Sequence, residues 1–111
     1  MSITGQVAII TGASRGMGLE ISKALARSGA RVAMFARDAV RLKEAVREVE
    51  AQGGVAVSIP TDVTDWAQVS HSVDQVVQQF GKIDIVVNSA FWGPPASIDR
   101  KSVVEGKSVD L

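Results

Sequence analysis

Short apolar runs alternate with longer amphipathic segments along most of this chain. The short runs are rich in β-branched residues and do not alternate with polar ones, which is typical of strands buried on both faces. Each run begins or ends near a glycine, so four separate strands are predicted. These strands are expected at Gln6–Thr11, Arg31–Phe35, Val55–Pro60 and Ile83–Val87.

The segments between the strands carry apolar residues at helical spacing, which predicts three amphipathic helices. The first, from Gly18 to Gly29, has its apolar face at Ile21, Ala24, Leu25 and Ser28. The second has its face at Leu42, Ala45, Val46 and Val49. The third has its face at Trp66, Val69, Val73, Val76, Val77 and Phe80.

Cap residues mark the ends of the second and third helices. Asp38 is the expected N-cap of the second helix, and Gly53 with Gly54 ends it. Thr64 or Asp65 caps the third helix, and Gly81 closes it. Helices that alternate with buried strands predict an α/β fold with right-handed crossovers and a doubly wound parallel sheet in the order 3-2-1-4.

The pattern stops after Val87. The segment that follows is loop-like, and Gly93, Pro94 and Pro95 interrupt any regular element there. No further helix or strand is predicted. We therefore expect a sheet truncated after its fourth strand, with Ile83–Val87 as an unpaired edge.

Composition excludes several classes of function. The net charge is zero, which gives no electrostatic reason to expect nucleic acid or an anionic membrane as a partner. Cysteine is absent and His71 is the single histidine, so neither disulfides nor a conventional zinc site are expected. No apolar run approaches the length of a membrane span, and the N-terminus lacks signal-peptide features. We expect a soluble cytoplasmic protein.

The stretch TGASRGMG, from Thr11 to Gly18, places three glycines between the first strand and the first helix. At that joint the free N–H groups and the dipole of the helix attract phosphate, provided that the backbone can come close. Gly12 would allow the tight turn, Gly16 the approach of a pyrophosphate, and Gly18 close packing of helix on strand. Ser14 and Arg15 add a hydroxyl and a cation. This predicts a Rossmann-type dinucleotide site.

TGASRGMG also resembles the cofactor loop of the short-chain dehydrogenases/reductases. Three further stretches agree with that family: GARVAMFARD, TDVTD and DIVVNSA. The resemblance covers residues 5 to about 90 in the order and spacing of the family. It implies a nicotinamide cofactor and a small carbonyl or alcohol substrate, and a longer parent protein that forms a homo-oligomer.

The resemblance also assigns roles to residues. Asp62 would accept a hydrogen bond from the adenine amino group, and Val63 would flank the ring. Asn88 resembles an asparagine that supports the catalytic site, and it is the one catalytic candidate here. The remaining expected cofactor contacts are Thr11, Met17, Ala90 and Asn88 itself, beside the glycine-loop residues. The family continues with Asn and Gly where this chain has Ser89 and Phe91.

Charge at the end of the second strand favours NADP over NAD. Enzymes of the family that use NAD carry an aspartate where this chain has the neutral Ala36. Arg37 follows, and Arg15 lies in the glycine loop, so two guanidinium groups could meet the 2′-phosphate. Asp38 is better placed as a helix N-cap than as a ribose ligand.

The family's catalytic Tyr-x-x-x-Lys pair has no counterpart, because the chain contains no tyrosine. Three interpretations stay open: the cofactor-binding part of an NADP-dependent reductase, a non-catalytic nucleotide-binding module, or a fragment without function. A 3-oxoacyl-carrier reductase would be a common subtype of the first, although no residue selects it. We expect the chain alone to be inactive.

The segment Asp99–Leu111 carries no motif of the family. It resembles a translated DNA-sequencing adapter in twelve of its thirteen residues, with Glu105 replacing a stop codon. The expected organisation is a partial dinucleotide-binding domain over residues 1–98, followed by a non-native tail over residues 99–111.

Overall fold

The computed structural model describes residues 3–89 and 107–110. Three helices are present among them: α1 (Gly16–Arg27), α2 (Ala39–Ala51) and α3 (Trp66–Phe80). The strands are β1 (Val7–Thr11), β2 (Arg31–Ala36), β3 (Val55–Pro60), β4 (Ile85–Asn88) and β5 (Lys107–Asp110). Strands and helices alternate from β1 to β4, as the sequence predicts.

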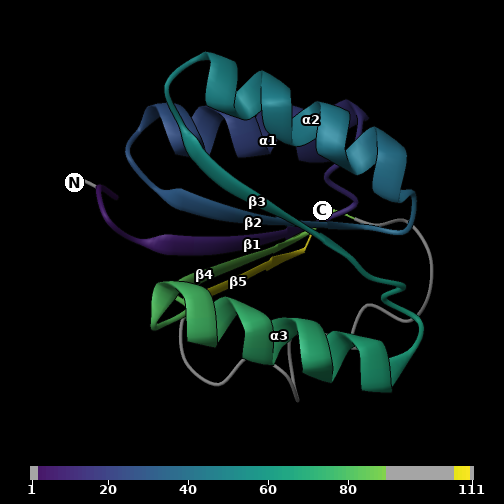
Figure 1. The fold of residues 1–111 in the computed structure, drawn as a ribbon. Coiled ribbons are helices and arrows are strands. Elements are labelled where there is room, and N and C mark those ends of the chain that lie inside the picture. The colour runs from purple at the N-terminus through teal and green to yellow at the C-terminus, as the bar shows by residue number, and fades with distance from the viewer. Residues whose placement is uncertain (1–2, 90–106, 111) are drawn as a thin grey trace.

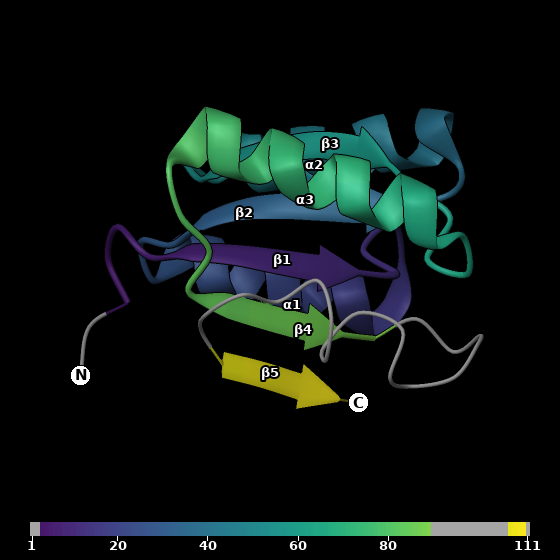
Figure 2. The ribbon, with the colours of Figure 1, turned by 90° about the horizontal axis from the view of Figure 1, so that it is seen from below.

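All strand pairs in the sheet are parallel, and the strand order is β3-β2-β1-β4-β5 (Figure 2). The predicted order 3-2-1-4 is therefore confirmed. The register aligns Thr11 at the end of β1 with Phe35 of β2 and Asn88 of β4. Because Ala36 pairs with Pro60 in the same way, the loops that leave these four strands all emerge at one edge of the sheet.

The fifth strand corrects two predictions. The sheet does not stop after β4, and the edge of β4 is not unpaired, since its residues pair in parallel with Lys107–Asp110. The sequence Lys-Ser-Val-Asp contains one apolar residue and is four residues long, so hydrophobic periodicity cannot reveal it. Backbone groups along β4 offer hydrogen bonds to an adjacent strand whatever its side chains are.

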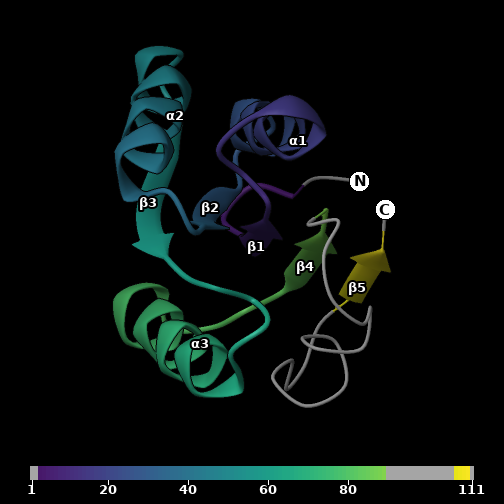
Figure 3. The same cartoon turned by 90° about the vertical axis from the view of Figure 1, so that its right-hand side faces the viewer.

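Helices cover both faces of the sheet. Figures 1 and 3 show α1 and α2 on one face and α3 on the other. Along β1, Ala8 and Ile10 belong to the core beneath α1 and α2, while Val7 and Ile9 belong to the core beneath α3. All four side chains are buried. This double burial explains why the strands lack polar alternation.

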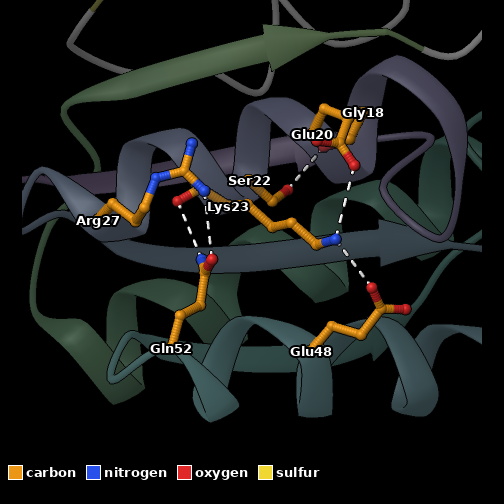
Figure 4. Close-up of polar contacts among 7 residues, drawn as sticks. All are labelled: Gly18, Glu20, Ser22, Lys23, Arg27, Glu48 and Gln52. Atoms are coloured by element: carbon orange, nitrogen blue, oxygen red, sulfur yellow. Dashed lines mark hydrogen bonds and ion pairs between the residues drawn. The ribbon is translucent and has the colours of Figure 1, made fainter.

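The buried face of α1 differs from the predicted one. Ala24 and Ser28 are exposed, and the helix instead turns Gly18, Ser22 and Ala26 toward the sheet. The Ser22 hydroxyl donates to the Gly18 carbonyl oxygen at 2.8 Å, which satisfies this buried polar group within the helix (Figure 4). Small residues four apart allow close packing but produce little hydrophobic periodicity.

Ion pairs and hydrogen bonds join α1 to α2 (Figure 4). The Lys23 ammonium lies 2.8 Å from a Glu48 carboxylate oxygen and 3.5 Å from one of Glu20. The bond to Glu48 raises the pKa of Lys23 above its usual value. Gln52 donates to the Lys23 carbonyl oxygen and accepts from Arg27, each at 3.2 Å. These contacts fix α2 alongside the helix that follows the glycine loop.

The other two helices follow the predictions more closely. The predicted face of α2 is buried, and Asp38 caps this helix by accepting a hydrogen bond from the Arg41 N–H at 3.1 Å. Asp65, rather than Thr64, caps α3. The assignment of two residues to the buried face of α3 is wrong, because Trp66 is 48% exposed and Val77 is 42% exposed.

None of the helices in the described ranges is long and apolar enough to cross a membrane. The same ranges hold no group of three or more histidine, aspartate or glutamate side chains arranged to bind a metal ion.

Candidate functional site

The glycine loop leaves β1 at the carboxyl edge of the sheet and leads directly into α1. Gly12 and Gly16 have φ angles of 62° and 61°, a left-handed conformation that glycine adopts without strain. Between them, the Ala13 N–H donates to the Phe35 carbonyl oxygen at 3.1 Å, which fastens the loop to the end of β2. The predicted tight turn at Gly12 is therefore present.

Gly18 lies against the start of this loop. A Cβ built on Gly18 would stand 2.1 Å from the Gly12 carbonyl oxygen and 2.6 Å from the Ser89 hydroxyl. No real side chain tolerates such distances, so the packing requires glycine. This agrees with the role predicted for Gly18, which is to let α1 approach β1 closely.

The N-terminus of α1 has the features of an anion-binding site. Its N-cap residue Arg15 has an extended backbone and makes no side-chain cap hydrogen bond, whereas Asp38 and Asp65 cap α2 and α3. The first turn of α1 contains no acidic residue. Arg15 and Met17 are exposed beside these N–H groups, and Ser14 is half-buried. A phosphate could satisfy the first N–H groups of the helix and its dipole.

A buried polar network joins the ends of β1 and β4. The Thr11 hydroxyl lies 2.8 Å from Asn88 Oδ1, to which it can donate, and it accepts from the Ser89 N–H at 3.0 Å. The Ser89 hydroxyl in turn donates to the Thr11 carbonyl oxygen. The network holds the segment after β4 against the glycine loop. Asn88 is buried and its side-chain oxygen faces Thr11, so it helps to shape this edge.

The other predicted site residues lie at the same edge. Arg37 follows β2 directly and is exposed, while Asp62 and Val63 form the turn after β3 and are half-buried. The Thr61 N–H donates to the Ala36 carbonyl oxygen at 2.8 Å, which ties the two turns together. Ala90 and Phe91 lie outside the described residues.

The Asp62 carboxylate has two donors from one residue. Its Oδ1 accepts from the Thr64 hydroxyl at 2.6 Å and from the Thr64 N–H at 2.9 Å. These bonds, with a smaller contribution from the nearby Arg37 cation, hold the pKa of Asp62 below its usual value. Asp62 is therefore an anionic acceptor at neutral pH. Sequence reasoning did not identify Thr64 as its partner, because it considered Thr64 only as a helix cap.

Taken together, the edge offers a phosphate site at α1, a cation at Arg37 and an acceptor at Asp62. The distribution suits a dinucleotide: the uncapped helix fits a pyrophosphate, and the two turns beside it fit an adenosine. No atom lies within 4 Å of the place where a Cβ on Gly16 would stand, so the loop backbone at Gly16 is open to a ligand. The residues present thus fit a nicotinamide dinucleotide, and the bound cofactor would supply the hydride donor or acceptor.

Comparison with known proteins agrees with this geometry. A family model described as short chain dehydrogenase matches residues 6–105. A ketoacyl reductase, HetN, from a Nostoc species is 39% identical over 89 residues, which are 80% of this chain and 31% of the relative. The chain spans about a third of the length of the curated relatives that it matches.

Solved structures of the family superpose well on the chain. A metagenomic short-chain oxidoreductase in complex with NADP has a TM-score of 0.79 and 38% identity, over 86% of this chain and 43% of that one. An NAD⁺-bound xylitol dehydrogenase has a TM-score of 0.79 and 35% identity, over 83% and 35% of the two chains. The chain therefore belongs to the short-chain dehydrogenase family of oxidoreductases, which use nicotinamide dinucleotides.

Proposed function

We propose that this chain is the NADP(H)-binding part of a short-chain oxidoreductase, which transfers hydride between the nicotinamide and a carbonyl or alcohol substrate. The observation that carries the proposal is the N-terminus of α1. It lacks a side-chain cap and an acidic first turn, and the loop before it packs glycine on glycine. Such an end attracts the pyrophosphate that NAD and NADP share.

The preference for NADP rests on the turn after β2. Ala36 is neutral, and the Asp38 carboxylate already accepts the Arg41 N–H as the cap of α2. The last residue of β2, Ala36, and the residue that follows it, Arg37, therefore supply no carboxylate to the ribose hydroxyls of NAD. Arg37 and Arg15 are both exposed at this edge, and guanidinium groups suit a 2′-phosphate.

The contributions of the remaining residues follow from their positions. The exposed and half-buried residues Gly12, Ser14 and Gly16 would hold the pyrophosphate, while the buried Thr11 and Gly18 would shape the loop. Asp62 with Val63 would hold the adenine. Catalysis requires an acid that protonates the substrate oxygen, and the tyrosine that serves the family is absent from these 111 residues. We therefore propose binding without turnover for the chain alone. A ketoacyl substrate, a homo-oligomeric parent and a cytoplasmic location stay predictions.

The test is a titration of the purified chain with NADPH and with NADH, followed by nicotinamide fluorescence at constant ionic strength. We expect saturable binding of both, with NADPH at least about tenfold tighter, since one charge-assisted hydrogen bond contributes roughly 1.5 kcal/mol or more. Tighter binding of NADH would contradict the cofactor preference. Absence of binding by either nucleotide would refute the proposed function.

A further inference from the structure

Polar side chains from the first two turns of α3 form hydrogen bonds with the turn that carries Asp62. Gln68 and Ser72 are four residues apart and so lie on one face of the helix. The Ser72 hydroxyl is 2.7 Å from that of Thr61, and both residues are buried. The Thr61 hydroxyl also bonds the Ile59 carbonyl oxygen at 2.9 Å. This buried contact fixes the end of β3 against α3.

Gln68 extends the contact to Asp62 itself. Its side-chain oxygen accepts from the Asp62 N–H at 2.9 Å, and its amide nitrogen donates to Asp65 Oδ2 at 3.2 Å. Asp65 in turn caps α3 by accepting from the Ala67 and Gln68 N–H groups. The Asp62 backbone is thus bonded to a side chain that the helix cap also holds.

Thr64 fixes the side chain of Asp62. Both of its donors converge on Oδ1, and no other hydrogen bond to this carboxylate occurs within the described residues. The carboxylate is therefore held in one orientation, and its second oxygen is left to accept from a ligand. A donor pair on one oxygen restricts the side-chain torsions before any ligand arrives, which reduces the entropy that binding costs.

We propose that Gln68 and Thr64 are positioning residues that orient Asp62 toward the adenine amino group of the cofactor. Gln68 fixes the backbone of Asp62, Thr64 fixes its carboxylate, and Ser72 anchors the turn to α3. The inference rests on the proposed function, because Asp62 takes this role only if a dinucleotide binds. It extends the site to a helix on the opposite face of the sheet from α1 (Figure 3).

The variants Gln68→Met and Thr64→Val test the proposal, since each keeps the shape of the side chain and removes its hydrogen bonds. Thr64→Ser restores the hydroxyl. Gln75→Met is the matched control, because Gln75 is exposed on α3 and makes no side-chain hydrogen bond with a described residue. The two ligands are NADPH and its hypoxanthine analogue, in which a carbonyl oxygen replaces the adenine amino group.

The measured quantity is the ratio of the two dissociation constants for each variant. We expect the unmodified chain to favour NADPH about tenfold, as one hydrogen bond to a carboxylate implies. The ratio should fall close to one in Gln68→Met and Thr64→Val, and it should recover in Thr64→Ser and persist in Gln75→Met. General loosening of the fold would weaken both ligands equally and leave the ratio unchanged.

Amide hydrogen exchange gives a readout that needs no cofactor. The Asp62 N–H should exchange about tenfold faster in Gln68→Met than in the control, because it loses its acceptor. Unchanged ratios in Gln68→Met and Thr64→Val, or unchanged exchange at Asp62, would overturn the inference while the proposed function stands. If the unmodified chain does not bind NADPH, the proposed function fails and the inference fails with it.

Discussion

Gly18 packs so closely on Gly12 that a Cβ on Gly18 would lie 2.1 Å from the Gly12 carbonyl oxygen. The carbonyl carbon and oxygen of Gly12 are backbone atoms, which cannot turn aside as a flexible side chain could. The contact therefore sets the distance between the first turn of α1 and the end of β1. That distance defines the shape of the proposed phosphate site.

Replacing Gly18 with alanine should lower the free energy of unfolding by about 1–3 kcal/mol, the usual cost of overpacking. The sign is informative, because alanine inside a helix normally stabilises relative to glycine by roughly 0.5–1 kcal/mol. Urea denaturation followed by circular dichroism measures the change. In the comparison variant Gly16→Ala the new methyl enters open space at a φ of +61°, so only backbone strain of about 1–2 kcal/mol applies. Equal or greater stability of Gly18→Ala than of the unmodified chain would show that the contact is not restrictive.

Replacing Arg37 with aspartate should reverse the cofactor preference. The change removes a cation that faces the proposed 2′-phosphate site and supplies a carboxylate that can accept from the ribose hydroxyls of NAD. NADPH affinity should fall at least about tenfold, and NADH should bind more tightly than NADPH. Arg47→Asp introduces the same charge change farther along α2 and should keep the original preference, because Arg47 is exposed away from the turn. An unchanged NADPH affinity in Arg37→Asp would show that Arg37 does not contact the bound cofactor.

Asp84 should make stability depend on pH in the acid range. Its carboxylate accepts the Val7 N–H at 2.9 Å and lies 3.1 Å from the Lys82 ammonium, and these contacts lower its pKa in the folded state. A lowered folded pKa stabilises the protein fully above the unfolded value of about 3.9. The contribution is lost as the pH falls through the folded value.

The Asp84→Asn variant isolates the charge. It should be less stable than the unmodified chain at neutral pH, and the difference should shrink steadily below about pH 4. Denaturant midpoints measured from pH 7 to pH 2 give the result. Asp74→Asn serves as the control, since Asp74 is exposed and its side chain makes no hydrogen bond or ion pair with another described residue. A stability difference that does not change with pH would mean that the ionised form of Asp84 contributes nothing.

The sequence predicted the order of the elements from β1 to β4, and most of their bounds to within about two residues, because buried strands and capped helices leave strong local signals. β3 occupies the predicted residues. As expected, Asp38 caps the start of α2 and Gly81 caps the end of α3. The glycine loop was recognisable because three glycines at a strand-helix joint have few other uses. The local pattern of residues was sufficient to predict those features that a single segment of the chain determines.

Features that depend on contacts between segments were not predictable in this way. The face of α1 was misplaced because Ser22 is buried with its hydroxyl bonded inside the helix, so a polar residue occupies a core position. Trp66 was assigned to the core by its hydrophobicity, although it is the first residue of α3 and is half-exposed. The bond from Asp62 to Gln68 joins residues six apart across a turn, and no periodicity marks such a pair.

The most direct test of the account maps where the cofactor binds. The ¹⁵N-labelled chain is titrated with NADPH, and the amide resonances are followed by nuclear magnetic resonance. We expect saturable shifts concentrated at the carboxyl edge of the sheet, at Gly12, Gly16, Gly18, Arg37 and Asp62, with no change at the opposite edge near Asp84. Saturable shifts centred elsewhere, or none at the glycine loop at saturating NADPH, would contradict it.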